Sequence, residues 1–308
     1  MAGARHVPSA LAALDGAGVW LNSDPLTAER LRGNVVLVDF WTYSCVNWLR
    51  TLPYLRAWHE RYRDRGLVVV GAHAPEFGFE HDLENVRRAT GELGVAYPVV
   101  IDNDFLIWRS FENHYWPAVY LADSEGRVQF QHFGEGEYEQ TEGAIQRLLG
   151  IDEDTVRVDA GGRAEAADWA KLSSPETYLG YGRGERRSDS GPDGLEPNHW
   201  ALAGAWSVEE EAAVLEAPDG SITYRFEARD VNMVLAPPDG EAPVRFTVRL
   251  DGDSPGDAHG VDVDGSGQGT VSEPRMFQLI RQRGAGGERD FEITFLDAGV
   301  RAYVFTFG

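Results

Sequence analysis

The chain has 308 residues, 43% of them hydrophobic and 11% aromatic, a composition that supports two folded domains and excludes an intrinsically disordered protein. Fifty acidic against 28 basic residues give a net charge of −22, which argues against nucleic acid or an anionic membrane surface as a partner. A single cysteine excludes an intramolecular disulfide. We find no signal-peptide pattern and no run of about 18 apolar residues, so we expect a cytoplasmic protein without membrane insertion.

The first part of the chain alternates short apolar runs with helical patterns. Residues 35–41 (VVLVDFW) and 67–73 (LVVVGAH) are continuous runs rich in β-branched residues, typical of strands buried on both faces. Between them, leucine and aromatic residues recur at three- and four-residue steps, which predicts a helix. A strand, helix, strand unit of this kind predicts a parallel strand pair.

The pattern continues to about residue 150. We expect helices near 83–93 and 105–111 around a short strand at 97–102, then a hairpin of strands 118–122 and 127–133, and a last helix at 139–149. These elements define an α/β domain over residues 1–150.

The remaining sequence changes character twice. Residues 151–197 are polar and glycine-rich, which predicts a linker with some ordered pieces. Residues 198–308 contain alternating segments whose apolar residues fall on single faces. These are Ile222/Tyr224/Phe226, Phe246/Val248/Leu250, Phe291/Ile293/Phe295 and Tyr303/Phe305/Phe307. We therefore expect an all-β antiparallel sandwich, jelly-roll-like, after the α/β domain.

Cys45 stands where the first predicted strand gives way to a helix. A thiol at the first turn of a helix faces unpaired backbone N–H groups and the positive end of the helix dipole, which favour the thiolate. Small polar and aromatic residues surround it in the sequence, and we expect them to line the site: Trp41, Thr42, Tyr43, Ser44, Trp48 and Trp116. An inert buried thiol is the alternative interpretation.

Three stretches resemble a known family. Phe40 to Trp58 (FWTYSCVNWLRTLPYLRAW), HAPEF at 73–77 and WPAVYL at 116–121 resemble the TlpA-like thioredoxins. NHWALAGAW at 198–206, AHGVDVDG at 258–265 and FQLIRQ at 277–282 resemble the sandwich that follows in DipZ-type thiol:disulfide interchange proteins. The resemblance implies a thioredoxin-like fold, a carbohydrate-binding-module-like sandwich and thiol oxidoreductase chemistry without a cofactor. DipZ-like relatives work outside the cytoplasm, in contrast to the location expected above.

The same resemblance assigns roles to individual residues. It implies that Pro117 is the cis proline that shapes a substrate groove, and that Glu76 is a carboxylate near the thiol that relays protons or tunes it. An ordinary solvated loop glutamate is the alternative for Glu76. His73 is a weaker candidate, with a structural role as its alternative.

Trp48 departs from the family pattern, because it occupies the place of the second cysteine in Cys-x-x-Cys. A lone thiolate stops at the mixed disulfide, so we expect Cys45 to act by monothiol exchange with a protein or a low-molecular-weight thiol or disulfide. The alternative is a non-catalytic module whose thioredoxin fold or sandwich binds a protein or a glycan. A single-cysteine peroxidase is a minor alternative, based on the Thr-x-x-Cys spacing of Thr42 and Cys45.

The second domain offers weaker signals. Trp200, Trp206 and Tyr181 lie outside the alternating segments, and they are candidates either for sugar stacking or for packing against the first domain. Asp262, Asp264 and Glu273 match the bare spacing of a calcium loop, but strand-like flanks favour an acidic hairpin turn instead. We therefore expect no metal and no cofactor.

Overall fold

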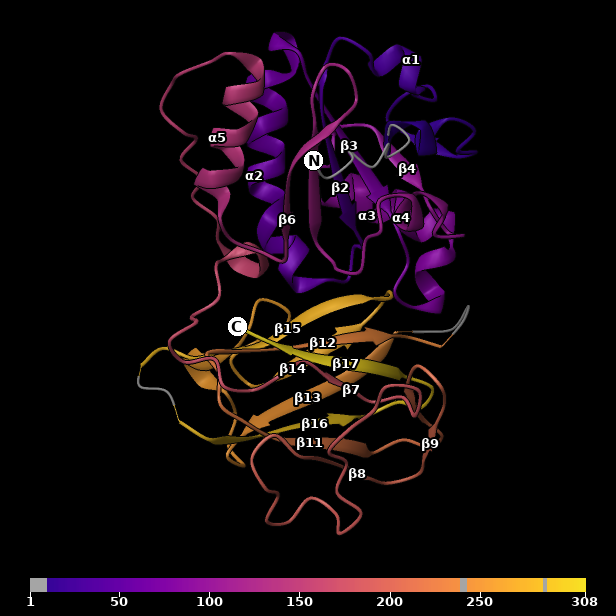
Figure 1. The fold of residues 1–308 in the computed structure, drawn as a ribbon. Helices are drawn as coiled ribbons and strands as arrows, with labels where there is room; N and C mark the ends of the chain where they lie inside the picture. The colour runs from indigo at the N-terminus through magenta and orange to yellow at the C-terminus, as the bar shows by residue number, and fades with distance from the viewer. Residues whose placement is uncertain (1–9, 239–242, 285–286) are drawn as a thin grey trace, which may run out of the picture. The chain divides into compact units, whose positions relative to one another are not determined.

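The computed structural model describes residues 10–238, 243–284 and 287–308, and its contacts divide the chain into two compact units. One unit ends at Ala164 and the other runs from Glu165 to Gly308 (Figure 1). Residues 151–164 of the predicted linker thus belong to the first unit and residues 165–197 to the second. No helix of the described chain is both long and apolar enough to cross a membrane.

The first unit is built on one mixed sheet with the strand order β1-β4-β3-β2-β5-β6. Strands β2, β3 and β4 pair in parallel, and β5 and β6 add in antiparallel fashion. The strands are β1 (Trp20–Leu21), β2 (Val35–Trp41), β3 (Leu67–His73), β4 (Val99–Ile101), β5 (Ala118–Ala122) and β6 (Val128–Phe133). The helices are α1 (Ala28–Leu31), α2 (Val46–Tyr62), α3 (Leu83–Glu92), α4 (Leu106–Ser110) and α5 (Tyr138–Leu149), with short 3-10 turns at Ala10–Leu14, Arg63–Arg65, Gly78–His81 and Gly162–Ala164.

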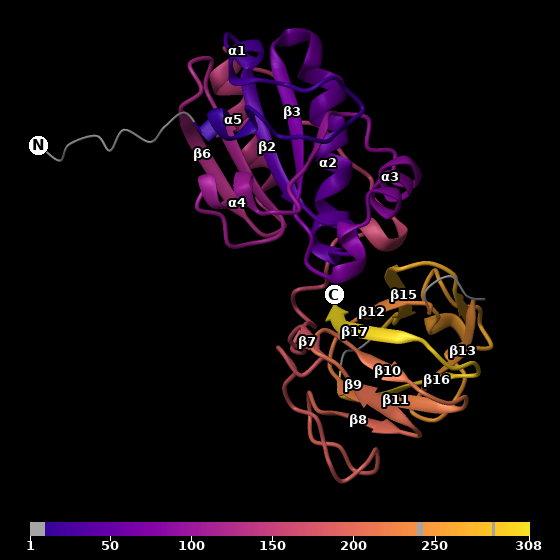
Figure 2. The same cartoon turned by 90° about the vertical axis from the view of Figure 1, so that its right-hand side faces the viewer.

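The central strands are buried on both faces because helices cover both. Val36, Val38 and Phe40 of β2 pack in a cluster with residues of α1 and α4. The opposite face carries Asp39 and meets α2, which lies beside α5 (Figures 1 and 2). Every residue of β2 is buried, as its unbroken apolar run predicts. The predicted α/β, thioredoxin-like sheet is confirmed.

The second unit is a sandwich of two antiparallel sheets, which confirms the predicted fold class (Figure 1). One sheet has the order β15-β12-β17-β10-β9, with β7 paired to β17, and the other has the order β14-β13-β16-β11-β8. The strands are β7 (Thr177–Tyr178), β8 (Trp200–Ala203), β9 (Trp206–Val208), β10 (Ala213–Leu215), β11 (Gly220–Phe226), β12 (Asp230–Ala236), β13 (Val244–Leu250), β14 (Gln268–Val271), β15 (Arg275–Arg281), β16 (Arg289–Phe295) and β17 (Arg301–Phe307), with a 3-10 turn at Gly256–Ala258.

The sandwich core differs from the expected pattern at β17. Phe305 and Phe307 point into the core as predicted, but Ala302 takes the third inward place instead of Tyr303. The cause is a register shift against β12, where Val234 pairs with Val304 and Leu235 with Ala302. An irregularity of this kind changes which residues face inward, and a prediction based on strict alternation cannot locate it.

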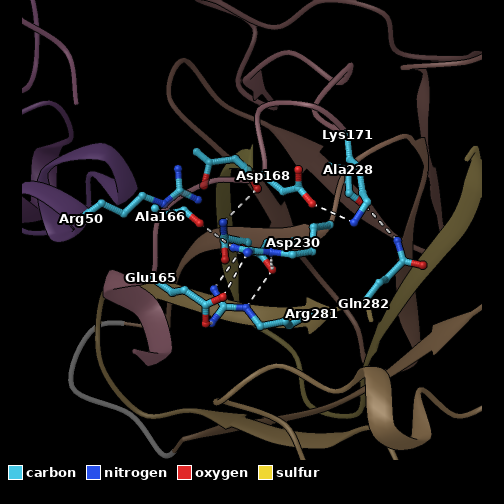
Figure 3. Close-up of polar contacts among 12 residues, drawn as sticks. Arg50, Glu165, Ala166, Asp168, Lys171, Ala228, Asp230, Arg281 and Gln282 are labelled. Atoms are coloured by element: carbon cyan, nitrogen blue, oxygen red, sulfur yellow. Dashed lines mark hydrogen bonds and ion pairs between the residues drawn. The ribbon is translucent and has the colours of Figure 1, made fainter. Parts of the chain in front are cut away.

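A dense ion-pair network holds the start of β12 (Figure 3). The Asp230 carboxylate is fully buried and accepts hydrogen bonds from Arg229 and Arg281 at 2.8–3.1 Å. Both arginines also bind Glu165, at 3.0 and 2.7 Å. Two cations and two anions thus balance at one point, and the network fixes the first residue of this unit to its sheet.

Candidate functional site

Cys45 is the N-cap residue of α2 and lies four residues after Trp41, the last residue of β2, with a turn between them. Its backbone is extended, with φ −74° and ψ 115°, its N–H donates to the Thr42 carbonyl at 3.3 Å, and its carbonyl accepts from the Leu49 N–H at 3.0 Å. The residue is partly exposed. The sulfur therefore sits at the positive end of a 17-residue helix, a position that favours a negative charge on it.

A buried carboxyl lies behind this turn. Glu80 is fully buried and accepts a hydrogen bond from the Ser44 hydroxyl at 2.6 Å, so it contacts the residue directly before Cys45. Its second oxygen accepts from the backbone N–H groups of Glu76 at 2.6 Å and Phe77 at 3.0 Å. Burial, together with the charge of Glu76, raises the pKa of Glu80 to about 7. The site thus contains an acid that changes charge near neutral pH.

A second buried acid lies under the other side of the turn. Asp39 of β2 is fully buried, and its Oδ2 atom accepts a hydrogen bond from the Trp48 indole N–H at 2.8 Å. Burial raises the pKa of Asp39 to about 7, while the Trp48 hydrogen bond opposes the shift. The residue in place of a second cysteine is therefore a core side chain that donates to one oxygen of this carboxyl.

The aromatic residues predicted to line the site fall into two groups. Trp41 and Trp48 are fully buried and stack with ring centroids 4.2 Å apart, and His73 meets the Trp41 ring edge-on at 4.9 Å. Tyr43 stacks on His73 at 5.9 Å. Burial lowers the pKa of His73 to about 3, so this imidazole is neutral at physiological pH. Trp41 and Trp48 thus support the turn from inside the core.

Trp116 belongs to the second group, next to a proline. The Trp116–Pro117 peptide bond is cis. The half-buried Trp116 ring lies 4.4 Å from that of Trp108, and its N–H donates to the Ala74 carbonyl at 3.1 Å. Ala74 in turn donates its N–H to the Trp41 carbonyl at 3.0 Å, which ties the proline segment to the end of β2.

The two candidate acids of the segment after β3 differ in setting. Glu76 is half-buried and its N–H binds the Glu80 carboxylate, whereas Glu80 is fully buried and contacts Ser44. Sequence reasoning missed Glu80 and Asp39, and the available signal was weak. Asp39 interrupts an otherwise apolar strand, and Glu80 lies in a 3-10 turn that no periodicity predicts.

In the second unit, the candidate aromatics separate by burial. Trp200 is buried in the sandwich core, and the half-buried Trp206 packs against Phe295 with ring centroids 5.9 Å apart, so both serve packing. Tyr181 is 69% exposed, and sugar stacking by this residue stays a prediction. Sugar stacking by Trp200 is thereby contradicted, because its faces are covered.

The acidic residues with calcium-loop spacing are engaged in other contacts. Asp262 and Glu273 each pair with Arg275 at 3.0 Å, and Asp264 accepts hydrogen bonds from the N–H groups of Ser266 and Gln268 in a turn before β14. Within the described ranges, no group of three or more His, Cys, Asp and Glu side chains is placed to hold a metal ion.

Comparisons with known proteins agree with this architecture. Residues 174–308 match the family model described as a thioredoxin-like C-terminal domain. The chain is 36% identical over 251 residues to Protein DipZ of Mycobacterium tuberculosis, covering 76% of this chain and 36% of the relative. It therefore spans about a third of the length of this relative.

Shorter relatives match the first unit. Thiol-disulfide oxidoreductase YkuV of Bacillus subtilis is 29% identical and matches 44% of this chain and 91% of its own length. A solution structure of a thioredoxin-like protein in its oxidised form is 29% identical, covering 44% of this chain and 90% of that one, with a TM-score of 0.41. With a TlpA/ResA-like thioredoxin domain followed by the thioredoxin-like C-terminal domain, the chain is DipZ-like in both of its units.

Proposed function

We propose that the chain performs thiol–disulfide exchange with Cys45 as its sole nucleophile. The Cys45 thiolate attacks a disulfide R–S–S–R′, forms the mixed disulfide Cys45–S–S–R and releases R′–S⁻. An external thiol then attacks the mixed disulfide, returns Cys45 to the thiolate and leaves with R as a new disulfide. Each turnover moves two electrons between external sulfurs, so the chain itself needs no second cysteine.

The observation that carries this proposal is the position of Cys45 at the N-cap of α2, partly exposed, at the end of a central strand. Helix dipole and unpaired N–H groups favour the thiolate there. Glu80, through Ser44, places a carboxyl that takes up or gives up a proton near neutral pH on the inner side of the turn. Pro117, beside the end of β2, is proposed to border the groove in which the partner disulfide lies.

The test is the alkylation rate of Cys45 by iodoacetamide from pH 5 to 10, read by intact mass in the folded protein and in 8 M urea. An activated thiol reacts faster at pH 7 when folded than when unfolded, with an apparent pKa below the usual value of about 8.5. Trapping of a mixed disulfide with glutathione disulfide, and its release by a second thiol, tests turnover. Cys45→Ser provides the blank for both measurements.

A non-catalytic binding module is the second candidate, and the buried Trp48 favours it. That side chain is fully buried against Trp41 and Asp39, so position 48 contributes packing in place of chemistry. A folded protein whose Cys45 reacts more slowly than in urea would support this candidate and contradict monothiol exchange.

A further inference from the structure

Two exposed aromatic side chains lie together next to the cis proline. Tyr115 is 54% exposed and Phe133 is 40% exposed, and their ring centroids are 5.2 Å apart. Isolated apolar residues on a surface are ordinary, but adjoining aromatic rings offer a partner a continuous apolar contact. We call this pair the Tyr115–Phe133 ledge.

Buried side chains hold the ledge in place. The Asn113 side chain is buried, and its amide donates to the Tyr115 carbonyl at 3.0 Å while its oxygen accepts from the Tyr120 hydroxyl at 3.3 Å. Tyr120 is buried, and its ring lies 5.8 Å from that of Phe133. A preorganised surface of this kind loses little entropy when a partner binds.

The sheet places the ledge at the same end as the thiol. Phe40, one residue before the end of β2, pairs with Ala118 at the start of β5, and Ala118 pairs with Phe133 at the end of β6. The turn that leads to Cys45 and the segment that contains Pro117 therefore lie at the same end of the strands. Gly134, next to Phe133, donates its N–H to the Pro117 carbonyl at 2.8 Å.

Charges near the ledge are mainly negative. Glu112, Glu137 and Glu139 are exposed and lie three, four and six residues along the chain from Tyr115 or Phe133. Glu135 is neutralised by the buried Arg50, whose Nη1 atom lies 2.8 Å from its carboxylate. The guanidinium of Arg109 donates to the Asp104 carbonyl on the preceding turn. The exposed rim thus favours a cationic partner, in line with the net charge of −22.

From these observations we propose that the ledge selects the substrate. It receives an extended polypeptide that carries a bulky apolar residue and a lysine or arginine beside its reacting cysteine. The apolar side chain lies on Tyr115 and Phe133, and the cation faces the exposed glutamates. Glutathione, which lacks a bulky apolar residue and carries net negative charge, is a poorer partner for this surface. This inference rests on the proposed exchange activity of Cys45.

The experiment uses the full chain and activated peptides. Each peptide carries one cysteine as a mixed disulfide with thionitrobenzoate, flanked by Leu and Lys, Leu and Glu, Ser and Lys, or Ser and Glu. Attack by Cys45 forms a Cys45–peptide disulfide and releases coloured thionitrobenzoate, one per thiol consumed. We expect the Leu/Lys peptide to react at least tenfold faster than the Ser/Glu peptide and than glutathione–thionitrobenzoate, after division by each reagent's rate with the urea-unfolded chain.

Variants and salt separate the apolar part of the peptide preference (Leu over Ser) from the charged part (Lys over Glu). Tyr115→Ser with Phe133→Ser should reduce the Leu-over-Ser ratio at least threefold and leave the Ser peptides unchanged. Tyr181→Ser removes a 69%-exposed tyrosine of the other unit and should change no ratio. Raising NaCl from 20 to 500 mM should erase the Lys-over-Glu ratio and spare the Leu-over-Ser ratio.

The outcomes are distinguishable. Equal normalised rates for all peptides with a reactive Cys45 would overturn the ledge proposal and leave the exchange activity standing. A Leu preference that survives the double substitution would also overturn it. Failure of every reagent in the folded chain, with normal reaction in urea, would overturn the exchange activity itself.

Discussion

The Trp48 indole N–H donates a 2.8 Å hydrogen bond to Asp39 Oδ2, with both side chains fully buried. The side chain in place of a second thiol therefore donates to a buried acid, whose other oxygen has no hydrogen-bond partner in the described part of the chain. A buried polar group without a hydrogen-bond partner is costly, so loss of this one hydrogen bond should lower the free energy of unfolding by more than loss of an average hydrogen bond.

Trp48→Phe should destabilise the first unit by about 1–3 kcal/mol beyond the loss of ring volume, because Asp39 loses its donor. Trp58→Phe is the matched control. Trp58 also donates to a buried carboxylate, Glu142, but that group keeps donors from Tyr62 and Val156. Urea unfolding at pH 7 measures both variants, and equal losses would contradict this account.

Asp39 should make stability fall as pH rises. Its pKa is about 7 in the folded protein against an ordinary 3.8, so the folded state binds more protons between these values. The group's contribution is complete below pH 3.8 and is lost by pH 7. Asp39→Asn removes the titration, so its stability relative to the natural chain should improve by about 2–3 kcal/mol from pH 5 to pH 8 in urea unfolding.

His73 should have the opposite effect on the pH dependence of stability. Burial lowers its pKa from 6.5 to about 3, so the unfolded chain binds more protons between these values and stability rises with pH. His73→Gln should therefore lose part of the rise between pH 5 and 6.5. A parallel change in both variants would show that the slopes come from other groups.

Glu80→Gln should change the pH profile of Cys45. Gln is isosteric, so its oxygen can still accept from Glu76 and Phe77 while its amide donates to the Ser44 hydroxyl. Removing a nearby negative charge favours the thiolate, so alkylation at pH 7.5 should become about two- to fivefold faster, with its apparent pKa lower.

The matched control for Glu80→Gln is Glu84→Gln, an exposed glutamate at the start of α3. It should leave the alkylation profile unchanged. An unchanged profile in Glu80→Gln as well would restrict Glu80 to a structural role behind the turn.

In the Asp230 network, loss of the buried carboxylate should cost more stability than loss of the exposed one. Asp230→Asn leaves two guanidiniums around a neutral buried amide and should cost about 3–5 kcal/mol. Glu165→Gln removes a carboxylate with a 42%-exposed side chain from the same arginines and should cost less than about 1 kcal/mol. Hydrogen exchange of β12 and β15 amides under mild urea measures both, and similar losses would contradict the role of burial.

The sequence by itself determined the fold classes and the central candidate. Unbroken apolar runs are typical of strands covered on both faces, and alternating runs are typical of strands with one buried face, because each pattern places its apolar side chains where such a sheet can bury them. The same patterns place the single cysteine between a buried strand and a helix, which made the turn at Cys45 the candidate site. Strands β12 and β15, with central residues buried throughout, were missed because they lack alternation.

Only the tertiary structure decided which polar groups surround the thiol and which aromatics face solvent. Glu80 lies 36 residues from Ser44, and Phe133 lies 18 from Tyr115, so no local period relates them. The burial that raises the pKa values of Asp39 and Glu80 comes from helices and turns packed from elsewhere in the chain. A charge's solvation depends on every neighbour in space, whereas a sequence pattern records only the neighbours along the chain.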